Sequence, residues 1–170
     1  MACSPEFLST KREFIERWGQ ISSTWGVCKS MAQIHALLLV SPKPLSATCI
    51  IDELNISSGG ANTHLRDLVA WGLLYKCEIK GCSIDYYISE KDSLKVSKII
   101  LENRKKRELD PIVELMNQVD HQQANCPDSM EFVRIIQEIK TLSTTIENTL
   151  DSILNTDKHR MLNTLFRLVQ

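Results

Sequence analysis

The sequence has few of the residues that build turns, and few aromatic side chains. Its 170 residues include six glycines, five prolines and only 6% Phe, Trp and Tyr. A β sandwich of many short strands needs turn residues at regular intervals, so this scarcity favours a helical fold. The length fits one domain, or a small domain with a long extension.

The chain also lacks an excess of charge of either sign. Lys and Arg number 20 and Asp and Glu number 21, which gives a net charge of −1. A strongly basic composition would have pointed to nucleic acid as the partner. A DNA-binding interpretation of this sequence must therefore rest on a motif.

Long apolar runs are missing as well. The most apolar stretch, "AQIHALLLV", is far shorter than the roughly 20 residues that span a membrane, and the first residues lack the basic-then-apolar pattern of a secretory signal. These features predict a cytoplasmic protein with no membrane partner. Its six cysteines are then expected to remain reduced thiols.

What the sequence does contain is apolar residues at helical and strand spacing. A stripe of large apolar residues (Phe7, Phe14, Trp18, Ile21 and Trp25) marks the first helix, which Gly26 ends. The expected elements are helices over 6–24, 30–40, 47–54 and 58–71, strands over 73–79 and 83–89, a helix over 92–119 and a polar break over 120–129.

The last segment repeats apolar residues every three or four positions. Phe132, Ile135, Ile139, Leu142 and Ile146 open this repeat, which continues to Leu168. Such a stripe is the seam of one helix packing against another. Because the core of this chain is small, the seam is expected to be buried in a partner, and we predict a homodimer.

The order of elements up to residue 89 is that of a winged helix-turn-helix domain. The residues "LLLVSPKPLSATCIIDELNISSGGANTHLRDLVAWGLLYK", then "DYY" and "ILENRKKRELDP", resemble the GbsR-type branch of the MarR family of bacterial regulators. The resemblance implies a mainly α fold with a small β hairpin. Its winged helix-turn-helix DNA-binding domain would cover 1–91, and a helical dimerisation region would cover 92–170.

The same resemblance implies a function. Members of this branch are homodimeric transcriptional regulators, and a repressor is expected here, with the helix over 58–71 in the major groove of double-stranded DNA. Regulators that resemble this branch often respond to choline or related osmoprotectants, so a choline-like effector is expected too.

The helix over 58–71 supplies the residues that would read DNA. If Ala61, Leu65, Leu68 and Val69 face the core, the polar residues between them face outward. Arg suits guanine, Asn suits adenine, and Thr can reach a thymine methyl group. The base-reading candidates are Ser58, Asn62, Thr63 and Arg66, and the phosphate-contact candidates are Ser57, Gly59, Lys76 and Lys80. The alternative is that Asn62 and Arg66 only coat a solvated helix.

Gly59 and Gly60 stand at the start of this helix, where each costs about 1 kcal/mol against alanine. One interpretation is that they let the first helical N–H groups approach phosphates. The other is that they allow close packing on the helix over 47–54. The sequence leaves both open.

The expected wing, "KGCSIDYY", is poor in basic residues. It holds Lys80 and a nearby Asp85, whereas wings of the broad family usually carry arginines that enter the minor groove. An alternative function is therefore a winged-helix protein-interaction module with weak or no DNA binding. The run "NRKKRE" over 103–108 is either a phosphate-contacting ridge or a solvated helix face.

Ligand, thiol and catalytic chemistry have weaker signals. Trp18, Trp25 and Tyr86 are candidate walls of an aromatic cage for a quaternary ammonium effector, against the alternative that such a stripe is core. Cys77 and Cys82 flank the wing and suggest a thiol-switched regulator as a further alternative. No metal, no cofactor and no enzyme are expected, because the sequence carries neither a persuasive metal-ligand spacing nor a catalytic signature.

Overall fold

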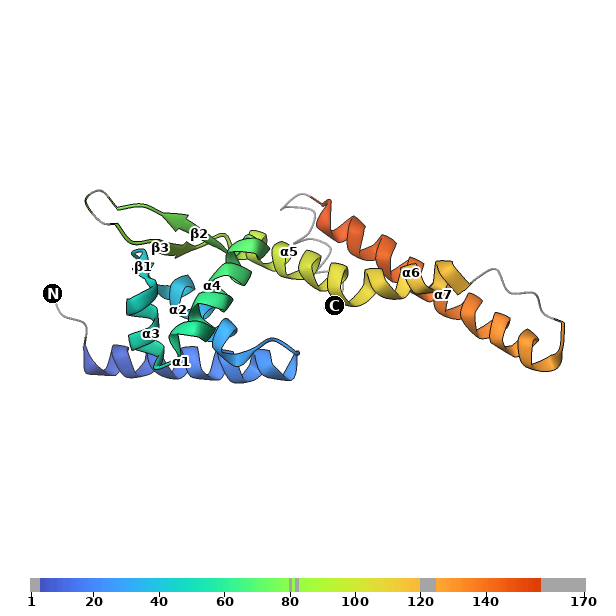
Figure 1. The fold of residues 1–170 in the computed structure, drawn as a ribbon, viewed down its shortest axis with the longest axis horizontal. Helices are drawn as coiled ribbons and strands as arrows, with labels where there is room; N and C mark the ends of the chain where they lie inside the picture. The colour runs from blue at the N-terminus through green and yellow to red at the C-terminus, as the bar shows by residue number, and fades with distance from the viewer. Residues whose placement is uncertain (1–3, 80, 82, 120–124, 157–170) are drawn as a thin grey trace, which may run out of the picture. The chain divides into compact units, whose positions relative to one another are not determined.

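A computed structural model describes residues 4–79, 81, 83–119 and 125–156. By contacts the chain divides into two compact units, Met1–Val96 and Ser97–Gln170. In chain order the elements are α1 (Pro5–Thr24), α2 (Lys29–Val40), β1 (Leu45–Ser46), α3 (Ala47–Leu54), α4 (Ser58–Trp71), β2 (Leu74–Cys77), β3 (Tyr86–Ser89), α5 (Ser93–Arg104), the π-helical segment η1 (Lys105–Leu109), α6 (Asp110–Val119) and α7 (Pro127–Leu154) (Figure 1).

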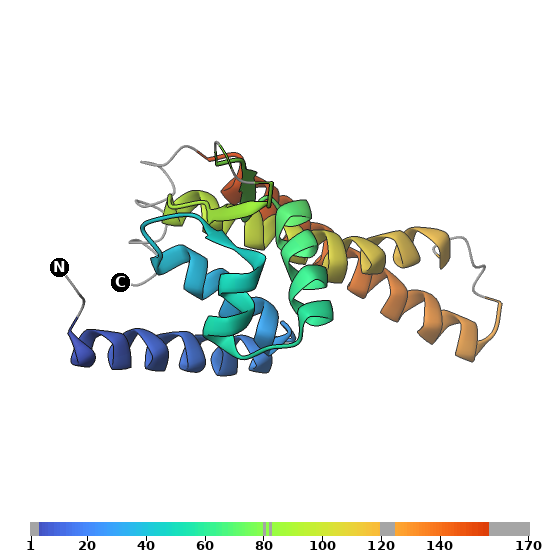
Figure 2. The ribbon, with the colours of Figure 1, turned by 60° about the vertical axis from the view of Figure 1, so that its left-hand side comes forward.

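Helix α2 is the centre of the first unit. Every residue from Met31 to Leu38 is buried, and α1, α3, α4 and β3 all pack against this helix (Figure 2). A helix that is apolar on all sides must be covered on all sides, which explains why the short run "AQIHALLLV" organises the unit. The fully buried large side chains are Ile34, Leu37, Leu38, Ile50, Leu65, Leu68 and Leu74.

The sheet has three antiparallel strands in the order β1-β3-β2. Strand β1 pairs Leu45 with Tyr87 and was not expected, because two residues are too few to show a periodicity. The two strands of the hairpin are shorter than the predicted 73–79 and 83–89. Ile79 and Ile84 are 40% and 53% exposed, so no core holds the outer part of this two-stranded ribbon together.

The predicted helix over 92–119 is helical throughout but changes its winding at η1. Pro111 lies just after this segment and has no N–H to donate to the carbonyl of Arg107. In η1 the hydrogen bonds span five residues instead of four, as from the Asp110 N–H to the Lys105 carbonyl. A single α-helix was therefore the wrong expectation for this stretch.

The apolar stripe of α1 does not lie in the core. Phe7 is 54% and Trp25 68% exposed, and the residues of α1 that are buried are Ile15 and Gly19. The interpretation of this aromatic stripe as core was wrong. The large residues of the stripe stay at least 38% exposed in the described part of the chain.

Gly19 marks the closest approach of α1 and α2, and we predict that Gly19→Val lowers the free energy of unfolding by about 1–3 kcal/mol. A Cβ at this position would lie 2.6 Å from Gln33 Cγ and 3.2 Å from the Lys29 carbonyl oxygen. The side chain of Gln33 can move, but the backbone of α2 cannot. Urea denaturation measures the change.

Gly59→Val is the matched control, since a Cβ there meets nothing within 4 Å. Equal losses of stability from the two substitutions would show that helix crowding at Gly19 is not the cause.

In the second unit, a single lysine ties η1 and α6 to α7. The Lys105 Nζ lies 3.1 Å from Glu147 Oε1, 3.2 Å from Asp110 Oδ1 and 3.4 Å from Asp151 Oδ1, and its side chain is only 15% exposed. The hydrogen bond to Glu147 is the main cause that raises the pKa of Lys105 above its usual value. The expectation of a solvated face over 103–108 was therefore wrong for Lys105, although Lys106 and Arg107 are exposed.

Helix α7 carries two stripes with alternating steps of three and four residues. The shielded stripe comprises Val133, Ile136, Lys140, Ser143, Glu147, Leu150 and Leu154. The exposed stripe, called here the outer seam, comprises Phe132, Ile135, Ile139, Leu142 and Ile146, which are 38–62% exposed. Helix α6 and η1 pack on α7, and among the described residues the outer seam stays exposed. The predicted continuation through Met161, Leu165 and Leu168 lies outside the described residues.

Candidate nucleic-acid interface

The turn between α3 and α4 is built by local capping. Asn55 ends α3 in the left-handed conformation, with φ of 50°, which short polar side chains tolerate better than most. Two residues later, Ser57 is the N-cap of α4: its Oγ accepts a hydrogen bond from the Gly60 N–H at 3.3 Å. Gly72 ends α4, also in the left-handed conformation. These caps hold α3 and α4 at a tight helix-turn-helix corner.

The buried and exposed faces of α4 lie as the periodicity predicts. Ala61, Leu65 and Leu68 are buried, and Val69 is half-buried rather than fully inward. The predicted DNA-reading residues share the other face: Ser58, Gly59, Asn62, Thr63 and Arg66 are all exposed.

Two of the polar side chains on this face are held by hydrogen bonds within α4. The Asn62 amide donates to Ser58 Oγ at 3.4 Å, and the Thr63 hydroxyl donates to the Gly59 carbonyl at 3.1 Å. Among the described residues, Arg66 has no hydrogen-bond or ion-pair partner. Its guanidinium, with donors suited to a guanine edge, is therefore available to a ligand.

Among the described residues, the glycines at the start of α4 do not serve close packing on α3. A Cβ on Gly59 would meet nothing within 4 Å, and one on Gly60 would meet only Ser57 Oγ, at 3.1 Å. The interpretation that they allow close packing on α3 is therefore wrong. Gly60 leaves room for the capping hydroxyl of Ser57. Gly59 has no side chain to cover the backbone of the first helical turn.

The wing places Lys76 beside an acid. Lys76 is opposite Tyr87 in the β2–β3 ladder, and its Nζ lies 2.6 Å from Asp85 Oδ2. The pKa of Lys76 is raised above its usual value by this hydrogen bond, so the lysine stays charged but is already paired. Lys80, the other predicted phosphate contact of the wing, lies outside the described residues.

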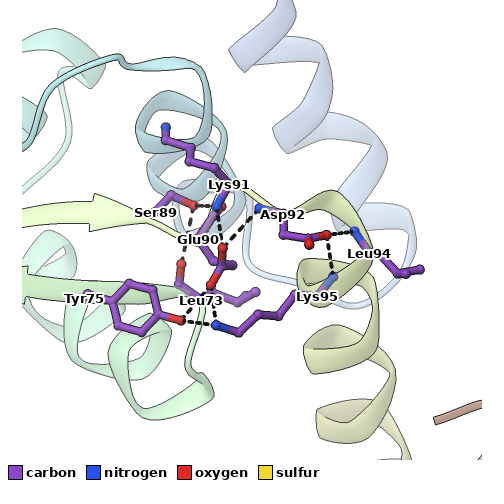
Figure 3. A network of polar contacts seen from close by, with 8 residues as sticks. All are labelled: Leu73, Tyr75, Ser89, Glu90, Lys91, Asp92, Leu94 and Lys95. Carbon is purple, nitrogen blue, oxygen red and sulfur yellow. Dashed lines mark hydrogen bonds and ion pairs between the residues drawn. The ribbon is translucent and has the colours of Figure 1, made fainter. Parts of the chain in front are cut away.

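A polar network fixes the base of the wing (Figure 3). Glu90, which follows β3, accepts a hydrogen bond from the Tyr75 hydroxyl at 2.9 Å and pairs with Lys95 Nζ at 2.5 Å. The Lys95 ammonium is the main cause that lowers the pKa of Glu90 to about 2, and the backbone N–H of Asp92 adds to it. Asp92 in turn accepts from the Leu94 N–H at 2.9 Å at the start of α5.

Lys91 binds the end of α2 from the same segment. Its Nζ donates to the carbonyls of Leu38, Leu39 and Ser41 at 2.6–2.8 Å. Carbonyls at a helix C-terminus have no partner within the helix and carry partial negative charge. Glu90 and Lys91 together tie the wing to the body of the first unit. The sequence did not indicate either role, because Tyr75 lies 15 residues from Glu90 and Leu38 lies 53 residues from Lys91.

The candidate cage residues are spread over two elements. Trp18 lies on the exposed stripe of α1, with its ring 5.7 Å from that of Phe14, and the exposed Trp25 is the C-cap residue that follows this helix. Tyr86 is half-buried in β3, opposite Cys77. Cys77 is a free thiol, and Cys82 lies outside the described residues.

Metal clusters and membrane-spanning helices are both absent from the part of the chain that the structure describes. No group of three or more His, Cys, Asp or Glu side chains there is placed to hold a metal ion. No helix there is both long and apolar enough to cross a membrane.

No protein-family model matches the chain, and no curated protein does. Among solved structures, the chain is similar to one described as the crystal structure of a transcriptional regulator, with a TM-score of 0.65 and 19% identity over 85% of this chain and 95% of the other. The chain has a winged-helix fold. The prediction of a mainly helical winged-helix fold with a small sheet is thereby confirmed.

Proposed function

We propose that this protein is a dimeric, sequence-specific DNA-binding transcriptional regulator that places α4 in the major groove. The observation that carries the proposal is the exposed face of α4, where Asn62, Thr63 and Arg66, which has no partner among the described residues, lie beside a first helical turn without side-chain cover at Gly59. Residues 1–91 would bind DNA and residues 92–170 would dimerise. The solved structure that resembles this chain is described as that of a transcriptional regulator, which is consistent with this function.

The outer seam of α7 supports the dimer. A heptad stripe that alternates steps of three and four is the contact of one helix with another, and α7 has two such stripes although α6 and η1 account for one. A second copy of α7 brings the same repeat and matches the seam. Two α6–α7 hairpins would then form a four-helix bundle.

A repressor role and a choline-like effector remain predictions. An effector changes DNA affinity only when it binds one arrangement of the two α4 helices more tightly than the other. Trp18 on α1 and Trp25 at its C-cap are exposed and accessible to such a cation.

The proposal is tested by DNA binding of wild-type protein and of Arg66→Ala. Duplexes selected by the wild type from a random library, and the DNA upstream of its own gene, serve as probes. A good Arg contact to guanine contributes about 1–3 kcal/mol, and a dimer would make it once in each half-site, so Arg66→Ala is expected to weaken binding at least about 30-fold. It should also relax sequence preference at one base pair of each half-site.

Arg12→Ala is the matched control, because Arg12 is exposed on α1 and its loss changes the net charge equally. Binding that is feeble, independent of sequence and equal in all three proteins would overturn the proposal.

One observation favours the second candidate, a winged-helix protein-interaction module. The pairing of Lys76 with Asp85 leaves the described part of the wing with little free positive charge. A salt series separates the two candidates, since DNA affinity falls steeply with salt and a protein–protein contact need not.

A further inference from the structure

We infer that Asp85 restrains the DNA affinity of the wing by holding Lys76 away from the phosphate backbone. The inference rests on the proposed function and concerns the regulation of its strength. Three features of the hairpin carry it: the register of its strands, the geometry of the ion pair and the exposure of both partners.

The register places the two charges on one face. Lys76 pairs with Tyr87 across the β2–β3 ladder, and successive side chains of a strand alternate between faces. Asp85, two residues before Tyr87, therefore lies on the same face of the hairpin as Lys76. The side chains meet at 2.6 Å, with the Lys76 Nζ also 5.9 Å from the centre of the Tyr87 ring.

Both partners are accessible to solvent. The Lys76 side chain is 51% exposed and that of Asp85 54%. An exposed ion pair of this kind is weak, so it does not lock the lysine. A phosphate can compete with the carboxylate for Lys76, but each binding event must first separate the pair and bring Asp85 close to the DNA. The pair therefore reduces affinity without abolishing it.

The same hairpin supplies a matched control. Glu78 is exposed on the segment just after β2, and among the described residues it has no ion-pair partner. Glu78→Gln and Asp85→Asn change the net charge of the wing equally. A general effect of charge on DNA attraction appears in both variants, whereas release of Lys76 appears in Asp85→Asn alone.

The experiment measures binding of the full chain to a short duplex of mixed sequence, by fluorescence anisotropy, between about 50 and 200 mM salt. Asp85→Asn is expected to bind about 5-fold more tightly than wild type at the low-salt end. Its plot of log affinity against log salt should be steeper by up to about 0.9, the contribution of one phosphate contact. Glu78→Gln should show a smaller gain.

A double-variant cycle tests the mechanism. In a Lys76→Gln background, Asp85→Asn should gain no more than Glu78→Gln does. Equal gains from Asp85→Asn and Glu78→Gln in the wild-type background, or a gain that persists without Lys76, would overturn the inference while DNA binding stands. Binding by Asp85→Asn but not by the wild type would support it. Absence of binding by every variant would overturn it together with the proposed function.

Discussion

Leu142→Glu is expected to convert the proposed dimer into a monomer. Leu142 is the most exposed residue of the outer seam, at 62%, and a two-fold dimer would bury it once in each copy. Burial of one leucine contributes about 1.5–3 kcal/mol, so loss of two costs about 3–6 kcal/mol before the cost of burying two carboxylates is added. The dissociation constant should rise at least about 100-fold.

The substitution leaves the monomer fold intact, because Leu142 is exposed in the single chain. Gln137→Glu is the control: it adds the same charge to an exposed position of α7 that belongs to neither stripe. Sedimentation velocity over a concentration series measures the dissociation constants, and circular dichroism shows that helix content is kept. A Leu142→Glu protein that sediments as a dimer would place the interface elsewhere, with the aromatic stripe of α1 as the next surface to test.

The helix-turn-helix was predictable because its signals are local. Ser46 and Ser57 cap the helices that follow them, and Gly72 ends α4. Each of these contacts lies within a few residues along the chain. Periodicity then placed Leu65 and Leu68 in the core, since the faces of α4 follow from helix geometry alone.

Features that depend on distant residues were not predictable. Strand β1 exists only through its pairing with β3 about 40 residues later, and the pairing of Lys76 with Asp85 follows from the register of the hairpin. The exposure of Trp18 depends on which side of α1 faces α2. Helical spacing shows that a helix has an apolar face, but it does not show what covers that face.

The largest effect expected within the first unit is its loss of stability in acid through His35. His35 is 4% exposed in α2, and no described group hydrogen-bonds its Nε2. Burial disfavours the charged imidazolium, the nearby Lys91 ammonium adds repulsion, and together they lower the pKa of His35 from 6.5 to about 4. The folded protein therefore keeps this histidine neutral at pH values where the unfolded chain protonates it.

Acid favours the state that binds more protons, which here is the unfolded chain. Below pH 6.5 the unfolded state binds a proton that the folded state binds only near pH 4, so stability is complete above pH 6.5 and falls as the pH drops toward 4. This gap in pKa corresponds to roughly 3 kcal/mol. Glu90 contributes in a lower window, since its stabilising charge is lost only as the pH falls from 4.5 toward 2. Between pH 6.5 and 4.5 the loss through His35 can therefore be separated from the loss through Glu90.

His35→Leu should remove this sensitivity, because leucine fills a similar volume in an apolar site and cannot take up a proton. Urea denaturation at pH 7 and pH 4.5 should show that the wild type loses about 2–3 kcal/mol more than the variant over this interval. At pH 7 the variant should be at least as stable as the wild type, since it no longer buries the unpaired Nε2. An equal loss in both proteins, or an NMR titration of His35 with a midpoint near 6.5, would show that this imidazole accepts its proton inside the fold and that the acid sensitivity has another origin.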